Sequence, residues 1–352
     1  MPGKISELKN KPMAIIAIGI ILLATLCAVF AYSLAPDNSE HANVMILELA
    51  AKSAGFEKDL LYLPKKQQQP PKSAWEQIWT GAVMNYEVVP INKYGTKGNT
   101  FWAAHYIDEG MQDTLYFKTT DLRAPIIKHR TFYLGTDPYG RDILSRLLIG
   151  ARVSIAVGFI SVLLSLCIGI VLGSIAGYYG GITDNIVMWL INLLWAIPTL
   201  LLVFAITLTL GKGFWEIFIA IGLTMWVGAA RLIRGQVMVI KQMDYISAAR
   251  ALGYGDMRIM FRHILPNIAG PLMVIAANNF AAAILTESGL SFLGIGVQAP
   301  QPSWGLMIKE HYNFLLSERP MLALIPGFAI MMLVFAFNIL GNALRDLFDV
   351  NA

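Results

Sequence analysis

DYISAARALGYGDMRIMFRHILP, residues 244–266, is the polar stretch around which the remaining sequence is arranged. It carries two aspartates, three arginines and a histidine, although long apolar runs flank it on both sides. Alanines and a leucine at 248–252 favour a helix, and Gly253 and Gly255 end it. Asp256 suits the N-cap of a second helix, which Pro266 would stop. The pattern predicts two short helices joined by a glycine turn, and we call residues 244–266 the elbow.

Six apolar segments outside the elbow are long enough to cross a membrane. A helical span needs about 20 mostly apolar residues, and only helices or closed barrels satisfy their backbone groups in lipid. The segments are 13–34, 153–176, 186–210, 214–230, 268–290 and 321–340. The predicted fold class is an all-α membrane protein with six transmembrane helices.

The composition agrees with a membrane protein. Hydrophobic residues make up 56% of the 352 residues and charged residues 14%, whereas a soluble domain carries about 25% charged residues. Cys27 and Cys167 lie in apolar runs, and the five histidines lack ligand spacing, so no metal site is predicted. No nucleic-acid partner is expected either.

Basic residues predict the orientation. Lys4, Lys9 and Lys11 lie before the first span, and six Lys or Arg residues follow the fourth span. An excess of Lys and Arg marks the cytoplasmic side. Both termini and the elbow are therefore expected in the cytoplasm. Three arginines before the second span fall on the outer side, but charge in long loops has little influence on topology. They are Arg141, Arg146 and Arg152.

The predicted organisation follows from these spans. It has a cytoplasmic tail (1–12), a first transmembrane helix (13–34), a long extracytoplasmic insert (35–138), an interfacial amphipathic helix (139–152) and a five-helix core (153–352) with a cytoplasmic loop at 241–267. Within the insert, KKQQQPPKS at 65–73 is typical of a linker. The interfacial helix would place apolar residues on one face and Arg141, Asp142, Ser145 and Arg146 on the other.

Catalytic machinery is not evident in the sequence. GTDPYGR at 135–141 has the glycine spacing of a phosphate loop but lacks its Lys-Ser/Thr pair. No Ser-His-Asp set, paired carboxylates or metal motif stands out. The chain is therefore expected to be a non-enzymatic subunit, with its energy supplied by another subunit or by an ion gradient.

Polar residues inside the spans are the candidates for a translocation path or gate, because a polar group in lipid is costly unless it faces protein or water. They are Asn192, Asn278, Asn279, Glu287 and Asn338. Pro198 should kink the third span. Interhelical hydrogen bonding remains the alternative for the asparagines, and a packing adjustment the alternative for Pro198.

Several motifs in order resemble a known family. Ala248-Ala249, Gly253, Leu265 and Pro266 resemble the cytoplasmic EAA loop of ABC importer permeases. LGTDPYGRD (134–142), LSFLGIGVQ (290–298) and PSWG (302–305) are similar to the dipeptide, oligopeptide and nickel permease branch, C-type subunit. The resemblance covers the first span and almost everything from about residue 132. Residues 40–130 are longer than expected for this branch.

The resemblance implies a type I ABC importer permease fold in a bacterial inner membrane. It also implies a homologous B-type permease partner, two cytoplasmic ATPase subunits that bind ATP and magnesium, and an extracytoplasmic solute-binding protein that delivers peptide. This chain itself would bind no cofactor, and membrane lipid would surround it.

The same resemblance implies that the elbow contacts an ATPase subunit. The expected contact residues are Asp244, Tyr245, Ser247, Ala248, Ala249, Arg250, Gly253, Asp256, Arg258, Leu265 and Pro266. The sequence departs from the motif in two places: Ser247 replaces its usual glutamate, and His263 its usual isoleucine. The arginines have a second interpretation, namely membrane anchoring on the cytoplasmic side.

Two other functions stay open from the sequence. The same fold could import nickel or another small solute, although few His and Cys residues lie in the spans. An ion-coupled secondary transporter would show internal repeats and paired broken helices. The sequence has neither, and such a transporter would not need the elbow.

Overall fold

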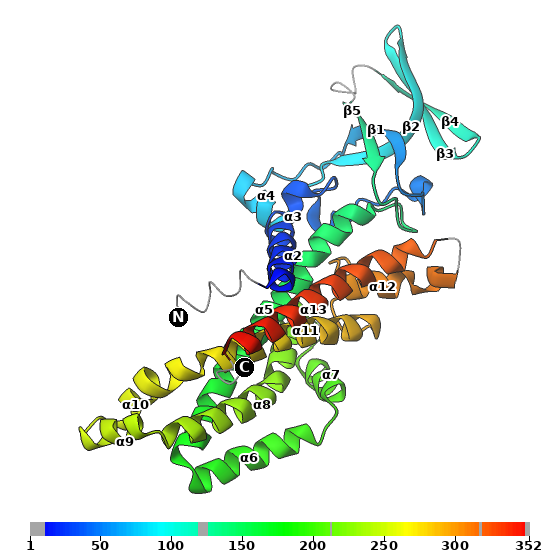
Figure 1. Cartoon of the computed structure of the whole chain (residues 1–352). Helices are drawn as coiled ribbons and strands as arrows, with labels where there is room; N and C mark the ends of the chain where they lie inside the picture. Colours follow the sequence, from blue (N-terminus) through cyan, green and yellow to red (C-terminus); the bar gives the residue numbers. More distant parts are fainter. Residues whose placement is uncertain (1–10, 119–125, 212, 317–318, 349–352) are drawn as a thin grey trace. The chain divides into compact units, whose positions relative to one another are not determined.

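The computed structural model describes residues 11–118, 126–211, 213–316 and 319–348. The chain divides into two compact units (Figure 1). The helical unit comprises Met1–Thr25, Val153–Gln298 and Trp304–Ala352, and the strand-bearing unit comprises Leu26–Arg152 with Ala299–Ser303. Lys4 and Lys9 of the predicted cytoplasmic tail lie outside the described residues.

The long helices agree with the predicted spans. Five described helical stretches are long and apolar enough to cross a membrane: Pro12–Val29 (α2), Ile143–Tyr179 (α5), Phe214–Lys241 (α8), Asp256–Phe292 (α10 to α11) and Met321–Phe348 (α13). A bent pair, Gly181–Trp195 (α6) and Thr199–Leu210 (α7), provides a sixth if it counts as one span. Trp304–His311 (α12) packs against both α11 and α13.

The third predicted span is not a continuous helix, which corrects the expectation of a kink. Its two halves meet at 93°. Pro198 directly precedes α7 with a φ of −54° and a ψ of 125°, outside the helical region. Proline also disfavours helical geometry in the residue before it and cannot donate a backbone hydrogen bond. The helix is thus interrupted at the position where a kink was predicted, but Pro198 separates two helices and does not bend a continuous one.

The predicted interfacial helix at 139–152 is also different in the structure. Helix α5 begins at Ile143 and continues without interruption to Tyr179. The residues expected on a solvated polar face are buried instead: Arg141, Asp142, Ser145 and Arg146. The expectation assumed that polar residues at helical spacing face water, but these side chains have protein around them.

Glycines let α5 and α8 approach closely. Gly169, Gly173 and Gly177 repeat every four residues and so share one face of α5. A Cβ added at these positions would lie 2.7 Å from the Ala229 Cβ, 2.5 Å from the Ala230 carbonyl oxygen and 2.7 Å from the Arg234 carbonyl oxygen, respectively. Such small-residue stripes allow helix backbones to pack against each other in membranes.

The strand-bearing unit contains a five-stranded antiparallel sheet that the sequence analysis did not predict (Figure 1). Its order is β4-β3-β2-β1-β5. The strands are Phe56–Pro64 (β1), Tyr86–Lys97 (β2), Thr100–Asp108 (β3), Met111–Lys118 (β4) and Ile126–Phe132 (β5). Short helices Ala31–Leu34 (α3) and Ala74–Thr80 (α4) belong to the same unit. The predicted linker at 65–73 lies between β1 and α4.

Both faces of the sheet are packed. Leu60 and Leu61 are neighbours on β1 and are both fully buried. Because successive side chains point to opposite faces, Leu60 joins a cluster with Ile46 and Phe132, whereas Leu61 joins one with Ile91. The two cores give the unit a fold of its own.

The phosphate-loop-like sequence at 135–141 forms a structural turn. One carboxylate oxygen of Asp137 accepts the backbone N–H groups of Tyr139 and Arg141, both at 2.9 Å. The other accepts the Arg141 Nε–H at 2.6 Å. Gly140 has a φ of +72° within this turn. Arg141, whose predicted position on the outer side runs against the cytoplasmic excess of basic residues, therefore forms a buried ion pair with Asp137 of the same unit.

Candidate functional site

The elbow has the predicted helix–turn–helix backbone. Its first helix, Asp244–Ala251 (α9), ends at a glycine turn in which Gly253 has a φ of +78°. The Gly253 N–H donates to the Arg250 carbonyl at 2.9 Å, and the Tyr254 N–H to the Ala249 carbonyl at 3.1 Å. This pair of bonds is a Schellman motif, which satisfies the last carbonyls of a helix.

Asp256 does not cap the second helix, contrary to the prediction. The helix Asp256–Ile259 (α10) starts at this residue, with Gly255 in the capping position. The Asp256 carboxylate instead accepts the hydroxyl proton of Tyr178 at 2.6 Å. The residue therefore ties the elbow to the end of α5.

Pro266 does not end the second helix either. A π turn at Met260–Ile264 and a 3-10 turn at Leu265–Ile268 follow α10 and lead into Ala269–Phe292 (α11). Irregular turns accommodate the proline, which lacks a backbone donor. As a result, Asp256–Phe292 forms one helical stretch of 37 residues. The second arm of the elbow is therefore the beginning of a predicted membrane span.

Tyr178 joins four helix ends. Its hydroxyl donates to Asp256 at the start of α10, and its carbonyl accepts a hydrogen bond from Lys241 Nζ, at the end of α8, at 2.5 Å. The Tyr178 ring centroid lies 5.4 Å from the Arg250 guanidinium of α9. Cation–π contacts of this kind contribute about 0.5–1 kcal/mol at exposed sites. Tyr178 lies in the last turn of α5 and was not among the predicted site residues.

A second connection holds α6 to α8. Arg234 donates from Nε and Nη2 to the two carboxylate oxygens of Asp184 at 2.5 and 2.6 Å. A two-point arginine–carboxylate pair fixes orientation as well as distance. Together with the α5 glycine stripe, this pair sets the position of α8, from which the elbow extends.

The inner face of the elbow is apolar and buried. Ile246, Ala249, Ile259 and Ile264 pack in one cluster with Ile240 of α8. Ala249 is only 5% exposed. The predicted docking surface therefore loses this alanine, which packs within the unit, and keeps Ala248 and Gly253, which are exposed.

The outer face presents apolar residues that the sequence analysis missed. Leu252, Met257 and Phe261 are 73%, 66% and 62% exposed. A Cβ added to Gly253 would meet no atom within 4 Å, so this face is open in the described part of the chain. Helical phase alone could not have shown this, because Met257 lies seven residues before the buried Ile264 and the π turn at Met260–Ile264 changes the phase between them. Exposed apolar surface of this kind is a candidate interaction site.

The other predicted elbow residues have defined positions. Asp244, Ser247 and Pro266 are exposed, and Leu265 is half-buried. Arg258 stacks over Tyr254 at 4.1 Å, and the Tyr245 hydroxyl accepts a hydrogen bond from Asn267 at 3.2 Å. Arg250 and Arg258 thus both lie over tyrosine rings of the same unit.

The predicted path residues do not gather at one place. Asn192 contacts Arg231 at 3.5 Å, and Asn279 donates to Ser165 at 3.4 Å. Glu287 is buried and accepts the Ser291 hydroxyl at 2.6 Å. Asn338 and Pro198 are exposed. These contacts fit the interhelical hydrogen-bonding interpretation for Asn279.

Asn278 is the one predicted path residue that lines a described cavity. This cavity has a volume of about 550 Å³ between α8, α11 and α13. Its other polar lining residues, Gln236 and Arg345, were not predicted. Pro271 and Val274 of α11 complete the same wall. A cavity with amide and guanidinium groups between membrane helices can hold water or a polar solute.

Known transport permeases are similar to this chain in sequence. The glutathione transport system permease protein GsiD of Pectobacterium atrosepticum is 36% identical over 82% of this chain and 95% of its own length. The oligopeptide transport system permease protein OppC of Bacillus subtilis is 40% identical over 66% of this chain and 76% of its own. A solved structure of the MetNI methionine ABC transporter, in an inward-facing conformation, is 19% identical with a TM-score of 0.43, covering 57% of this chain and 95% of that chain.

A family model also matches the helical core. It covers residues 169–351, more than half of the chain, and so includes the elbow, the α8–α11 cavity and most of the predicted spans. Together with the relatives, it identifies this multi-pass membrane protein as a member of the family of binding-protein-dependent transport system inner membrane components.

Proposed function

We propose that this chain is a transmembrane subunit of an ATP-driven importer of small peptides, and that its elbow transmits the motion of an ATPase subunit to the membrane helices. The observation that carries the proposal is the two-sided elbow. Its inner face is tied to α5 and α8 through Tyr178, while its outer face exposes Leu252, Met257 and Phe261.

The proposed motion runs along one helix. A groove on an ATPase subunit would bind the outer apolar face, with Gly253 allowing close approach of the two backbones. Because α10 continues through the π turn into α11, a displacement of the elbow moves the helix that carries Asn278. Rigid-body transmission of this kind is a common way to couple a remote site to a cavity.

The substrate class rests on the relatives, whose names specify glutathione and oligopeptide transport. An import complex of this family needs a solute-binding protein, which its family description names. We further propose a distinct B-type permease as the membrane partner, two ATPase subunits that bind ATP and magnesium, and a bacterial plasma membrane location. The cytoplasmic placement of both termini and the elbow is supported by their basic residues.

A matched pair of variants tests the elbow assignment. Met257→Glu places a charge on the outer face, and Met111→Glu makes the same change at a residue of β4 with 63% exposure. In the assembled complex, Met257→Glu should abolish peptide-stimulated ATP hydrolysis and release the ATPase subunits during purification, because it would bury an unpaired charge in the contact. Met111→Glu should retain both. If the Met257→Glu variant took up peptide at the normal rate and was expressed at the normal level, the proposal would be wrong.

A further inference from the structure

One strand of the sheet has an open edge in its first half. Strand β2 pairs with β1 from Tyr86 to Ile91. It pairs with β3 only from Ile91 onward, and the register shifts just after that residue. Within the described residues, positions 86–90 therefore have a neighbouring strand on one side and none on the other.

The direction of the backbone N–H and C=O groups along this edge follows from the hydrogen bonds between β1 and β2. The Lys65 N–H donates to the Asn85 carbonyl at 2.9 Å, so residue 85 faces β1. Antiparallel strands alternate between facing and averted residues, which directs the N–H and C=O groups of Tyr86 and Val88 away from β1. Outside the ladders, the backbone hydrogen bonds of the described residues include none from Tyr86 or Val88. Pro90 has no N–H to offer.

A cleft of about 830 Å³ lies along this open edge. Val88 packs with the core on one face of the sheet and Val89 with the core on the other. Both line the cleft together with Leu115 and Phe117 of β4, so the cleft includes the open edge and extends over part of the sheet. Its volume is within the range of about 300–1,000 Å³ that ligand sites have.

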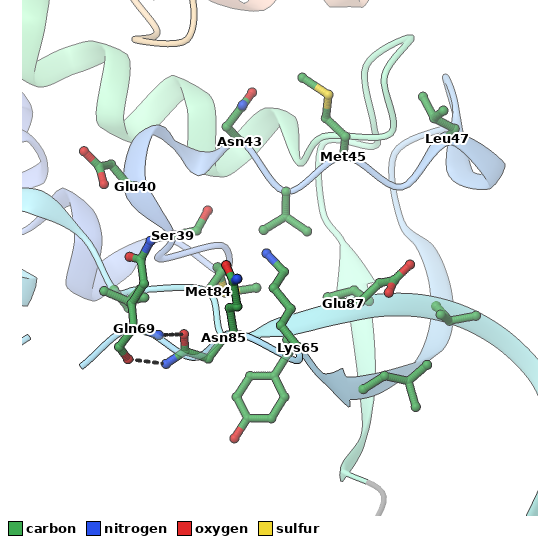
Figure 2. Close-up of a pocket in the computed structure, with 18 of the residues that line it drawn as sticks. Ser39, Glu40, Asn43, Met45, Leu47, Lys65, Gln69, Met84, Asn85 and Glu87 are labelled. Carbon is green, nitrogen blue, oxygen red and sulfur yellow. Dashed lines mark hydrogen bonds between the residues drawn. The ribbon is translucent and has the colours of Figure 1, made fainter. Parts of the chain in front are cut away.

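The opposite wall is formed by residues 43–47 (Figure 2). Figure 2 shows Asn43, Met45 and Leu47 on this segment, across from Lys65, which directly follows β1, and Glu87 of β2. Asn85 and Gln69 brace the polar end of the cleft through two hydrogen bonds of 2.9 Å each. The two walls thus come from parts of one unit that are far apart in the sequence.

The lining combines three kinds of recognition. Val88 and Val89 are apolar, and the edge offers averted backbone donors and acceptors. Lys65 and Glu87 provide one charge of each sign, and within the described residues neither has an ion pair. An extended peptide matches this set, because it carries main-chain amides, side chains on alternating sides and charged termini.

We propose that this cleft binds an extended peptide of the imported class, which adds as a strand to the β2 edge at Tyr86–Val89. Four edge residues at about 3.3 Å each span about 13 Å, which suits a short peptide of about four residues. Main-chain hydrogen bonds would provide affinity largely independent of sequence. The proposal rests on the proposed import of peptides and places a substrate site in the permease itself.

Val88→Pro is the sharpest variant, because the backbone N–H that it removes points away from β1 and is not needed for the β1–β2 ladder. Its matched control is Val88→Ala, which shortens the side chain and keeps the N–H. A second pair changes charge: Glu87→Lys lies in the cleft, and Glu109→Lys lies in the exposed β3–β4 turn. This second pair keeps the test decisive if the proline variant unfolds.

The probe is an alanine tetrapeptide with one residue replaced by p-benzoylphenylalanine, applied to the full permease–ATPase complex in nanodiscs without binding protein. We expect photo-cross-links at residues 43–48 and 82–89. Val88→Pro should weaken binding at least ten-fold and Val88→Ala less than three-fold. Glu87→Lys should change affinity for the charged termini, whereas Glu109→Lys should not.

Two outcomes would overturn the proposal: cross-links confined to the membrane helices, or equal binding by Val88→Pro and Val88→Ala. ATP-dependent peptide uptake is measured in parallel with the binding protein present. Uptake without cleft binding rejects this site alone, whereas absence of peptide uptake in the unmodified complex rejects the proposed function.

Discussion

The elbow exposes side chains, whereas the cleft along the β2 edge exposes backbone groups. In the elbow, the Schellman turn satisfies the backbone at Gly253, and the side chains of Leu252 and Met257 are left open. In the cleft, the side chains of Val88 and Val89 pack into two cores, and backbone groups are left open. Side chains recognise one partner of fixed shape, whereas backbone groups accept many sequences. The elbow therefore suits a dedicated partner and the cleft a variable ligand.

The largest effect is expected beneath the elbow, at the α5 glycine stripe. Gly173→Leu would push a side chain into the Ala230 carbonyl and the Ile233 side chain. Overpacking against a backbone costs about 3 kcal/mol. We expect a marked fall in the melting temperature of the assembled complex and loss of ATPase binding, with the strand-bearing unit still folded.

Gly228→Leu is the matched control for this change. It lies on α8, where an added Cβ meets nothing within 4 Å. Equal melting temperatures for the two variants would show that the stripe does not support the elbow.

The next effect separates the strand-bearing unit from the elbow. Gly140 has a φ of +72°, and a Cβ there would collide with the Ile46 carbonyl. Gly140→Ala should destabilise this unit by about 2–3 kcal/mol, from backbone strain and contact together. Gly110→Ala, with a φ of +84° and open space, should cost about 1 kcal/mol from strain alone. Hydrogen exchange of β1 measures both, and faster exchange in α9 would contradict the independence of the two regions.

A smaller effect concerns the attachment of the elbow. Tyr178→Phe removes the hydrogen bond to Asp256 and keeps the ring beside Arg250. The loss of one partly buried hydrogen bond corresponds to about 1 kcal/mol. We expect faster hydrogen exchange at residues 254–264 and weaker coupling of ATP hydrolysis to uptake. The control is Tyr179→Phe at the neighbouring exposed ring, which should change neither the hydrogen exchange nor the coupling. If the two variants behaved identically, Tyr178 would have no role in the proposed coupling.

The smallest effect is a pH dependence confined to the sheet. Hydrogen bonds to Asp59 and then Glu57 raise the pKa of His129 above 6.5. The stability that this charge contributes is fully present below the unfolded pKa and is lost as pH rises through the higher folded pKa. NMR titration of the ring should show the raised pKa, and Asp59→Asn should lower it. Asp113→Asn, on β4 at the opposite side of the sheet, serves as control; an equal shift there would contradict the local cause.

Apolar run length and glycine position were enough to predict the spans and the turn at Gly253, because both depend on local chemistry. The inward face of Ala249 and the buried Arg146 were not predictable, since their surroundings come from distant segments. The sheet was missed for a related reason: both faces of β1 are covered, so Leu60 and Leu61 do not alternate with polar residues. Pro198 indicated a bend, but its size depends on the packing of α6 and α7.

The break between α6 and α7 has a consequence for how the protein exists in a membrane. Residues Ala196 to Pro198 interrupt the helix and are exposed in the single chain. Lipid does not tolerate irregular backbone, which must face protein or water at membrane depth. A single copy of the chain would therefore expose irregular backbone to lipid at this break. We therefore expect the proposed partner permease to cover this break, and an unassembled copy to be short-lived in the cell.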